Sequence, residues 1–197
     1  MKRYVVRLLV AVAAGAAVWL GYTQLPWGNR DDELGAAGIV GVQHLGKDYP
    51  VSEFYINNYA GGKVGREGGG GGIVCCVMIP LQWRPGLTVD VRWRVEDWSH
   101  ENRTEIKAGD YRSVSVKGFY IAKVPVEKYD DPGDVYVHFF PRGRVRVVST
   151  MHSVLSRYHP VPYGPTDGGA MATAGWPVKE LFTEAELRAR ERGNPWK

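Results

Sequence analysis

Cysteine is scarce in this chain, and its two cysteines, Cys75 and Cys76, are neighbours. Two cysteines cannot staple a small disulfide-rich protein, and adjacent side chains that point to opposite faces of a strand do not make a zinc site. Adjacent Cα atoms lie about 3.8 Å apart, which is less than the roughly 4.4–6.8 Å that disulfides usually span. We therefore expect two buried thiols rather than a bond between them.

The chain also lacks the motifs of phosphate binding and of common hydrolases. The glycines at 68–72 lead straight into β-branched residues, whereas a P-loop requires Gly-Lys-Ser/Thr at the start of a helix. The five histidines include no H-x-x-x-H pair, and no serine lies in a nucleophile-elbow sequence. Asp130 and Asp131 precede Pro132-Gly133, where aspartates normally serve a turn. We therefore expect no catalytic residue, no metal and no cofactor.

An excess of one charge is missing as well, once the first thirty residues are set aside. The chain has 25 Lys and Arg against 21 Asp and Glu, and the first thirty residues contain four basic residues and no acid. Without those four, basic and acidic residues are equal in number. The excess of basic residues therefore lies in the first thirty residues, where it indicates membrane targeting, and no nucleic-acid partner is expected.

Residues 1–25 predict a signal anchor. Lys2, Arg3 and Arg7 precede an uncharged run of 15 residues from Leu8 to Tyr22, which is longer than a typical signal-peptide core and shorter than a full span of about 20 residues. Small residues suited to cleavage lie only inside this run. We favour an uncleaved helix in the inner membrane over a cleaved signal, and in both cases the rest of the chain should face the periplasm.

The chain after residue 37 is rich in short runs typical of β-strands. These runs alternate apolar and polar side chains or contain many β-branched residues, and turn residues separate them. The expected strands are residues 39–45, 52–59, 73–79, 87–96, 111–126, 135–140 and 144–150. They predict an all-β domain over residues 38–160, an antiparallel β-sandwich or partly open barrel, after a linker at 26–37.

Three features within this domain have specific interpretations. The run Ile73–Ile79 is apolar on both of its faces, so we expect it to be the central strand, covered on both sides. Gly118 should interrupt its strand as a bulge. Pro141–Gly143 predicts a tight hairpin, whereas residues 97–109 are polar and predict a mobile loop.

A Pro- and Gly-rich tail is expected from residue 161 to residue 197. Most of it should cross the surface irregularly, but residues 184–192 predict a short helix. Thr183 and Glu186 have the spacing of a capping box at its start, and arginines gather toward its end. A helix of this length is marginal unless it docks against the domain.

Several motifs together resemble one bacterial family. They are Phe54–Asn57, the glycine run followed by Val74–Val77, Trp83–Leu87, and the stretch from Tyr129 to Pro141. The chain from about Gly38 to Pro162 resembles a family of uncharacterised domains, many of them lipoproteins, that are encoded beside type VI secretion spike and lipase effector genes. The resemblance implies a periplasm-facing immunity protein that binds and neutralises a co-encoded effector, with a phospholipase as the favoured effector. It carries over no catalytic residue.

One departure from that family concerns the attachment to the membrane. Tyr22 stands where a lipidated cysteine would be expected. Attachment in this chain is therefore expected to come from the N-terminal helix itself.

Partner contacts are expected at the two ends of the apolar run Ile73–Ile79, because loops carry recognition while strands carry packing. Lys63, Arg66 and Glu67 supply charge at the glycine-rich end. Trp83 and Arg84 leave the other end, and Trp and Arg are frequent at binding hot spots. Opposite ends of one strand cannot both be the centre of a small interface, and we favour the glycine-rich end.

Two other functions remain open from the sequence. The first is a non-catalytic envelope module that binds glycan or another envelope component. The second is a thiol-redox or hydrolytic enzyme that uses Cys75, Cys76 or His138. Reactive thiols would favour this enzyme, whereas an effector gene beside this one would favour immunity.

Overall fold

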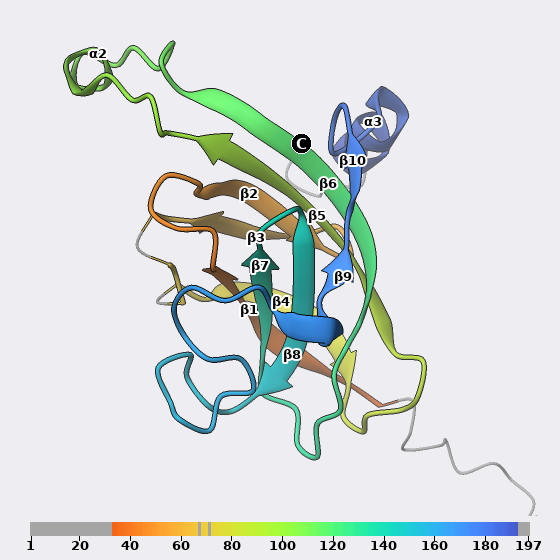
Figure 1. Cartoon of the computed structure of the whole chain (residues 1–197). Helices are drawn as coiled ribbons and strands as arrows, with labels where there is room; N and C mark the ends of the chain where they lie inside the picture. The colour runs from red at the N-terminus through yellow and green to blue at the C-terminus, as the bar shows by residue number, and fades with distance from the viewer. Residues whose placement is uncertain (1–32, 67, 71, 193–197) are drawn as a thin grey trace, which may run out of the picture.

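The computed structural model describes residues 33–66, 68–70 and 72–192, and in this part the chain forms two packed β-sheets (Figure 1). The predicted signal anchor and Glu67 lie outside the described residues. Within them, no helix has both the length and the apolar character that crossing a bilayer requires. The all-β fold is confirmed, and it consists of two separate sheets rather than one closed barrel.

Each sheet has five strands. Sheet A runs in the order β4 (Val74–Pro80), β1 (Leu34–Gln43), β7 (Asp134–Phe140), β8 (Arg144–Thr150) and β9 (Thr173–Ala174). Sheet B runs in the order β10 (Trp176–Val178), β6 (Ser115–Pro125), β5 (Thr88–Asp97), β2 (Val51–Ile56) and β3 (Tyr59–Val64). The pairs are antiparallel except β1 with β7, which is parallel, so the expectation of a purely antiparallel domain is wrong at this pair.

The main core lies between the inner faces of the sheets. Strand β5 shows why: its alternation buries Val89, Val91, Trp93 and Val95 on one face and leaves Asp90, Arg92, Arg94 and Glu96 on the other. The largest buried side chains of the core are Trp93, Phe54, Phe139, Ile39, Ile56 and Ile79. Phe54 meets Phe139 edge to face, with ring centroids 5.2 Å apart, so aromatic packing joins sheet B to sheet A.

The central strand of sheet A is β7, and the expectation that Ile73–Ile79 is central is wrong. Strand β4 pairs only with β1 and forms the edge of the sheet, and Ile73 and Met78 are 64% and 43% exposed. In β7 every residue from Val135 to Phe140 is buried. Both runs are apolar on two faces, but β7 has a neighbour on each edge and a cover on each face.

The expected pair of buried thiols is also wrong. Cys75 and Cys76 are joined by a disulfide, and Cys75 is exposed on edge strand β4. The register between β1 and β4 shifts here, between the partners of Ala37 and Ile39. The ladder therefore leaves the pair unmatched, and the two sulfur atoms are not forced onto opposite faces as they would be in a regular strand.

Several local expectations are confirmed. The hairpin between β7 and β8 turns through Arg142 and Gly143, whose φ angles are 63° and 64°. The register shift near Gly118 in β6 is the expected bulge. Helix α3 (Glu184–Arg192) begins with the expected capping box: the Glu186 amide donates to Thr183 Oγ1 at 3.3 Å, and the Thr183 amide donates to Glu186 Oε2 at 2.8 Å.

Strands also lie outside the expected domain bounds of residues 38–160, at both ends. Strand β1 already begins at Leu34, because the small residues there pair with β4, so the linker does not extend to residue 37. At the other end, β9 and β10 join the two sheets, and a 3-10 turn, η2 (Gly169–Met171), precedes them. Residues 161–192 therefore belong to the packed structure.

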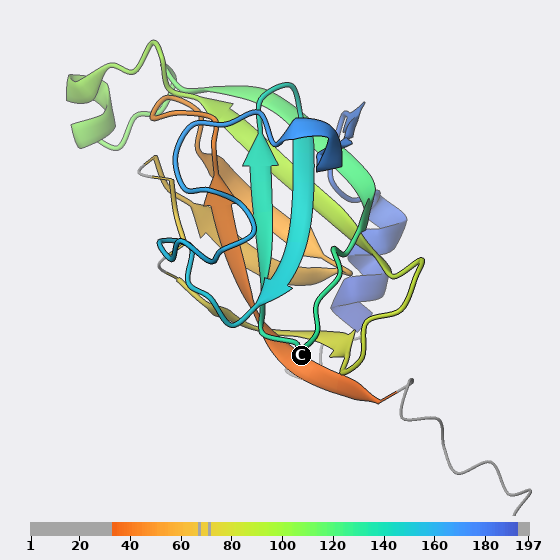
Figure 2. The ribbon, with the colours of Figure 1, turned by 60° about the horizontal axis from the view of Figure 1, so that its bottom comes forward.

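The outer faces of the two sheets have different covers. The segment 151–172 crosses sheet A and encloses a second apolar cluster, which includes Val40, Phe140, Val154 and Val161. Helix α3 lies beside sheet B, on the side away from β7 and β8 (Figure 2).

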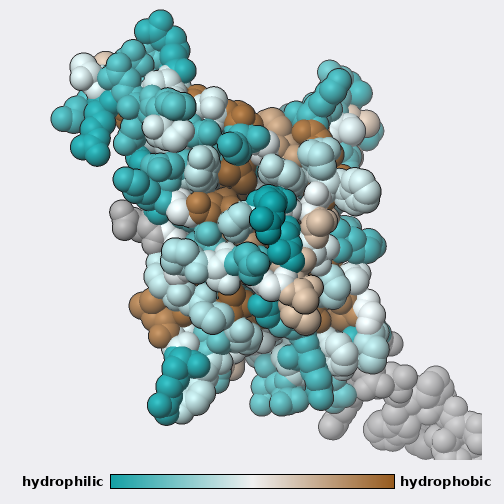
Figure 3. Space-filling view, viewed as in Figure 1, coloured by the Kyte–Doolittle hydropathy of each residue, from teal (hydrophilic) through white to brown (hydrophobic). Residues whose placement is uncertain are grey.

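Strands β5 and β6 run past the other strands to a projecting end, which carries the short helix α2 (Arg103–Lys107) (Figure 1). This end contains a capped helical turn within the expected loop and is strongly hydrophilic (Figure 3).

Candidate functional site: a groove on the outer face of sheet B

A groove of about 600 Å³ lies on the outer face of sheet B, on the part that α3 leaves uncovered. Its walls come from β2, β3, β5, β6 and the loops that lead into the projecting end. The side chains that give it chemical character are Lys63, Arg66, Arg94, Glu96, Trp98 and Tyr111. Alternation along β5 places Arg94 and Glu96 here, because Trp93 and Val95 between them enter the core.

Arg66 ties the glycine-rich segment to the loops that frame the groove. Its Nε donates to the Lys47 carbonyl at 2.6 Å, and its two terminal nitrogens contact Glu101 at 2.7 Å and Asp48 at 3.2 Å. The guanidinium lies 5.4 Å from the centroid of the Trp98 ring. The hydrogen bond to Glu101 raises the pKa of Arg66. With its donors engaged inside the protein, Arg66 organises the groove rather than offering a free charge.

A second polar network fixes the floor of the groove. Trp98 Nε1 donates to Glu96 at 2.9 Å, and Arg94 contacts the other oxygen of Glu96 at 2.5 Å and reaches Glu53 at 3.4 Å. Burial alone would raise the pKa of Glu96, but the hydrogen bonds from Trp98 and Arg94 lower it overall. The carboxylate therefore stays ionised at neutral pH and holds Trp98 in place.

The side chains available to a partner are those at the rim. Tyr111 is 56% exposed and Val116 is 47% exposed, and Lys63 is also exposed. The Tyr111 ring meets the Trp98 ring edge to face, with ring centroids 6.2 Å apart, so the Trp98 ring supports it. Tyr and Trp beside a cation are residue types that anchor protein interfaces.

The aromatic side chains of this groove were not among the contact residues expected from the sequence. Trp98 lies within residues 97–109, which we expected to be a polar loop, and Tyr111 follows that stretch. Nothing in their spacing brings them together with Arg66. The site is closed by the projecting ends of β5 and β6 together with residues 47–66, which include β2 and β3. The signal that was present is the density of Trp and Tyr in the chain, 7 and 11 residues respectively.

The other expected contact residues lie away from the groove, and the structure does not bring the two sets together. Trp83 donates from Nε1 to the Val126 carbonyl at 2.9 Å and packs against the main core. Arg84 is exposed on the turn after β4, near Tyr129. Of the glycine-rich set, Lys63 and Arg66 line the groove.

The residues that a thiol-redox or hydrolytic enzyme would use, Cys75, Cys76 and His138, lie outside the groove. Cys75 and Cys76 are bonded to each other, and His138 is buried between two other histidines on the far face of sheet A. In the described part of the chain, no group of three or more His, Cys, Asp or Glu side chains is arranged to hold a metal ion.

Comparison with known proteins gives one match. A family model described as a protein of unknown function, DUF3304, matches residues 46–147, which is more than half of the chain. The residues that line the groove all fall within this range, whereas β1 and the segment that covers sheet A fall outside it. No curated protein matches, and no solved structure matches.

Proposed function

Since the chain belongs to the DUF3304 family, which its description leaves without a function, we propose from the groove itself that this is a non-catalytic protein-binding module. The observation that carries the proposal is the rim of Tyr111, Val116 and Lys63 above a floor fixed by salt bridges. A preordered floor reduces the entropy that a partner must remove on binding. An aromatic and cationic rim matches the composition of interface hot spots.

The partner that we propose is a co-encoded antibacterial effector of type VI secretion, with a phospholipase favoured. The support is the resemblance of the motifs at Phe54, Trp83 and Tyr129–Pro141 to the family encoded beside such effectors. The protein would act as an immunity protein by covering the effector. We further propose that residues 1–25 hold it in the inner membrane with the β-domain in the periplasm.

The test is a binding measurement on matched tyrosine variants. The full chain in mild detergent is titrated with the product of the neighbouring effector gene, for the parent, Tyr111→Ala and Tyr158→Ala. Tyr158 is a suitable control because it is 61% exposed, as Tyr111 is at 56%, but lies on the segment that covers sheet A. We expect the Tyr111 variant to bind about 10–100-fold more weakly, as hot-spot truncations do, and the control to bind like the parent.

Equal affinity of the two variants would place the interface elsewhere. A second arm of the experiment expresses each variant in cells that are exposed to the effector and measures their survival. Survival should follow the affinity of the variant for the effector. Failure of the parent chain to bind or protect against any neighbouring effector would refute the immunity proposal itself.

A glycan-binding envelope module is the second candidate. The groove volume is within the range of small-ligand sites, and the exposed Tyr111 ring beside Trp98 offers a stacking surface to a sugar. Titration with soluble peptidoglycan fragments separates the two candidates: saturable glycan binding that Tyr111→Ala abolishes, with no effector binding, would favour this one.

A further inference from the structure

Three histidines that are far apart in the sequence form a continuous chain of contacts on the outer face of sheet A. His44 follows β1, and His138 lies within β7. His159 belongs to residues 151–165, the first part of the segment 151–172 that crosses sheet A, and these residues are called the covering segment below. His44 Nε2 lies 2.9 Å from His138 Nδ1, and His138 Nε2 lies 3.0 Å from His159 Nε2. All three residues are buried, with 4%, 0% and 7% of their surface exposed.

Each end of this chain is closed by a backbone carbonyl of the covering segment. His44 Nδ1 lies 2.6 Å from the Gly164 oxygen, and His159 Nδ1 lies 2.9 Å from the His152 oxygen. All six ring nitrogens of the three histidines are thus used in four contacts. Rotating any of the rings would replace a nitrogen by a carbon and lose a contact.

Counting protons shows that three neutral histidines cannot satisfy these four contacts. A carbonyl oxygen can only accept, so His44 and His159 must both carry their proton on Nδ1. When they are neutral, their Nε2 atoms are both acceptors, and both face His138. A neutral His138 has one N–H and can donate to only one of them. Four hydrogen bonds need four protons, and three neutral imidazoles supply three.

The surroundings work against a fourth proton. Burial lowers the pKa of His44 and of His159, and it holds the pKa of His138 well below its usual value. Arg146, opposite His138 on β8, also disfavours the added charge, although Glu127 pairs with it at 2.7 Å. The remaining titratable neighbours are Tyr136 beside His159, the His152 side chain and Tyr163 of the covering segment. Hydrogen bonding and burial therefore oppose each other at this one position.

We infer that His44, His138 and His159 form a buried site that binds one shared proton, and that this proton fastens segment 151–165 to sheet A. With the proton bound, His138 donates in both directions and all four contacts become hydrogen bonds. Without it, one pair of nitrogen lone pairs faces across about 3 Å, either between His44 and His138 or between His138 and His159. In both cases the hydrogen-bonded path between the two carbonyls of the covering segment is broken.

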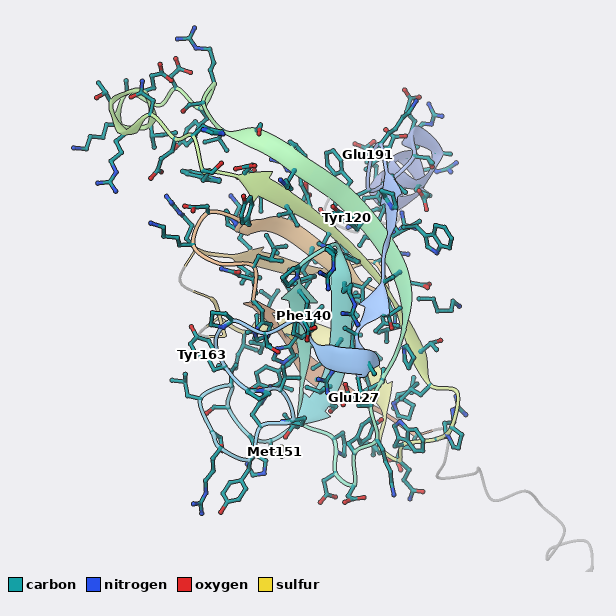
Figure 4. The ribbon with its side chains drawn as sticks, viewed as in Figure 1. Tyr120, Glu127, Phe140, Met151, Tyr163 and Glu191 are labelled. Carbon is teal, nitrogen blue, oxygen red and sulfur yellow. A yellow bond between two sulfur atoms is a disulfide. The ribbon has the colours of Figure 1, made fainter. Side chains whose placement is uncertain are left out.

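The covering segment has other contacts that would transmit this change. Val154 and Val161 anchor it in the second apolar cluster. A side chain on Gly70 would meet Val154, and one on Gly68 would meet the Tyr163 hydroxyl, so the segment touches the glycine-rich connection that follows β3. Phe140 stacks on His44 at 4.6 Å, and Figure 4 shows the segment that carries Tyr163 passing beside Phe140.

The experiment records the ring nitrogen resonances of the full chain in mild detergent, labelled with ¹⁵N at histidine, from about pH 8 to about pH 4. At the upper end we expect His44 and His159 as Nδ1–H tautomers. On acidification we expect one proton to enter, with the three rings shifting together at one midpoint, because coupled groups titrate as a unit. The resonances of His100 and His152, which are exposed and whose rings make none of the four contacts, are assigned alongside.

Two variants sharpen the test. His159→Gln places an amide donor against His138 Nε2, so both contacts of His138 are satisfied without an extra proton, and the shared step should disappear. The hydrogen bond to the His152 carbonyl is lost in this variant. His152→Gln keeps the backbone carbonyl and should leave the step in place. After correction for the pH dependence of intrinsic amide exchange, hydrogen exchange of segment 151–165 should slow about 10-fold or more through the step in the parent chain and not in His159→Gln. Separate midpoints for the three rings, an Nε2–H tautomer at either end in the neutral form, or exchange that ignores the step would overturn the inference.

Discussion

Replacing Gly61 with alanine should destabilise this protein, because the ring of Phe54 occupies the space that a Cβ atom would need. Three ring carbons of Phe54 lie 2.6 Å or less from the position of that Cβ. On the other side of the ring, a Cβ on Gly41 of β1 would lie 2.7 Å from it. Phe54 is 1% exposed, so the ring has no solvent to move into. Two glycines from different sheets thus let one aromatic ring fill the core where β1 and β3 approach.

The magnitude follows from overpacking a dense core. Forcing an extra methyl group into such a space costs about 1–3 kcal/mol, and the short distances here favour the upper half of that range. For a domain of this size about 2–4 °C of melting temperature is lost for each kcal/mol, so we expect a decrease of about 5–10 °C. The assay is thermal and urea unfolding of the full chain, followed by tryptophan fluorescence.

The same segment provides a matched control. Gly65 has nothing within 4 Å of its Cβ position and needs no left-handed backbone, so Gly65→Ala should leave stability unchanged within about 0.5 kcal/mol. In the double variant Phe54→Leu, Gly61→Ala, the smaller side chain should relieve the clash, so the two losses should not add. If Gly61→Ala melts with the parent, or if the two losses add fully, the packing argument is wrong.

Three further predictions concern residues outside the groove. The double variant Cys75→Ser, Cys76→Ser should lose no more than about 1 kcal/mol of unfolding free energy in urea, because the disulfide closes a two-residue loop and Cys75 is exposed. The parent should show no alkylable thiol by mass spectrometry. A loss of several kcal/mol in the variant would count against this prediction. Trp83→Phe should lose about 0.5–1.5 kcal/mol with its hydrogen bond to Val126 and keep its effector affinity; a selective loss of affinity would return Trp83 to the interface. The pKa of the Glu186 carboxyl, which a hydrogen bond from Arg92 lowers to about 2, should rise toward its ordinary value in Arg92→Gln by NMR. It should stay below that value, because the Thr183 amide still donates to the carboxylate, and an unmoved pKa would contradict the role of Arg92. Because the folded pKa is lowered, this pair stabilises the fold above the ordinary Glu pKa, and its contribution, below about 1 kcal/mol at a half-exposed site, is lost as the pH falls toward 2.

Local structure could be predicted from the sequence wherever one short stretch contains its own cause. The alternation of β5, the hairpin at Arg142 and Gly143, the bulge at Gly118 and the capping box of α3 each depend on residues within a few positions of one another. The period of the pattern fixes which side chains share a face, and turn residues fix where the chain reverses. The all-β class followed from these elements.

Only the tertiary structure decided which strand is central and what the buried polar residues do. Ile73–Ile79 and Val135–Phe140 both have two apolar faces, and a period of two cannot say which one obtains neighbours on both edges. The groove required Arg66 to meet Trp98, and the proton site required His44, His138 and His159 to meet, over sequence separations of 21 to 115 residues. Hydrogen bonds and ring contacts act over a few ångströms in space, so chain spacing alone contains no record of them.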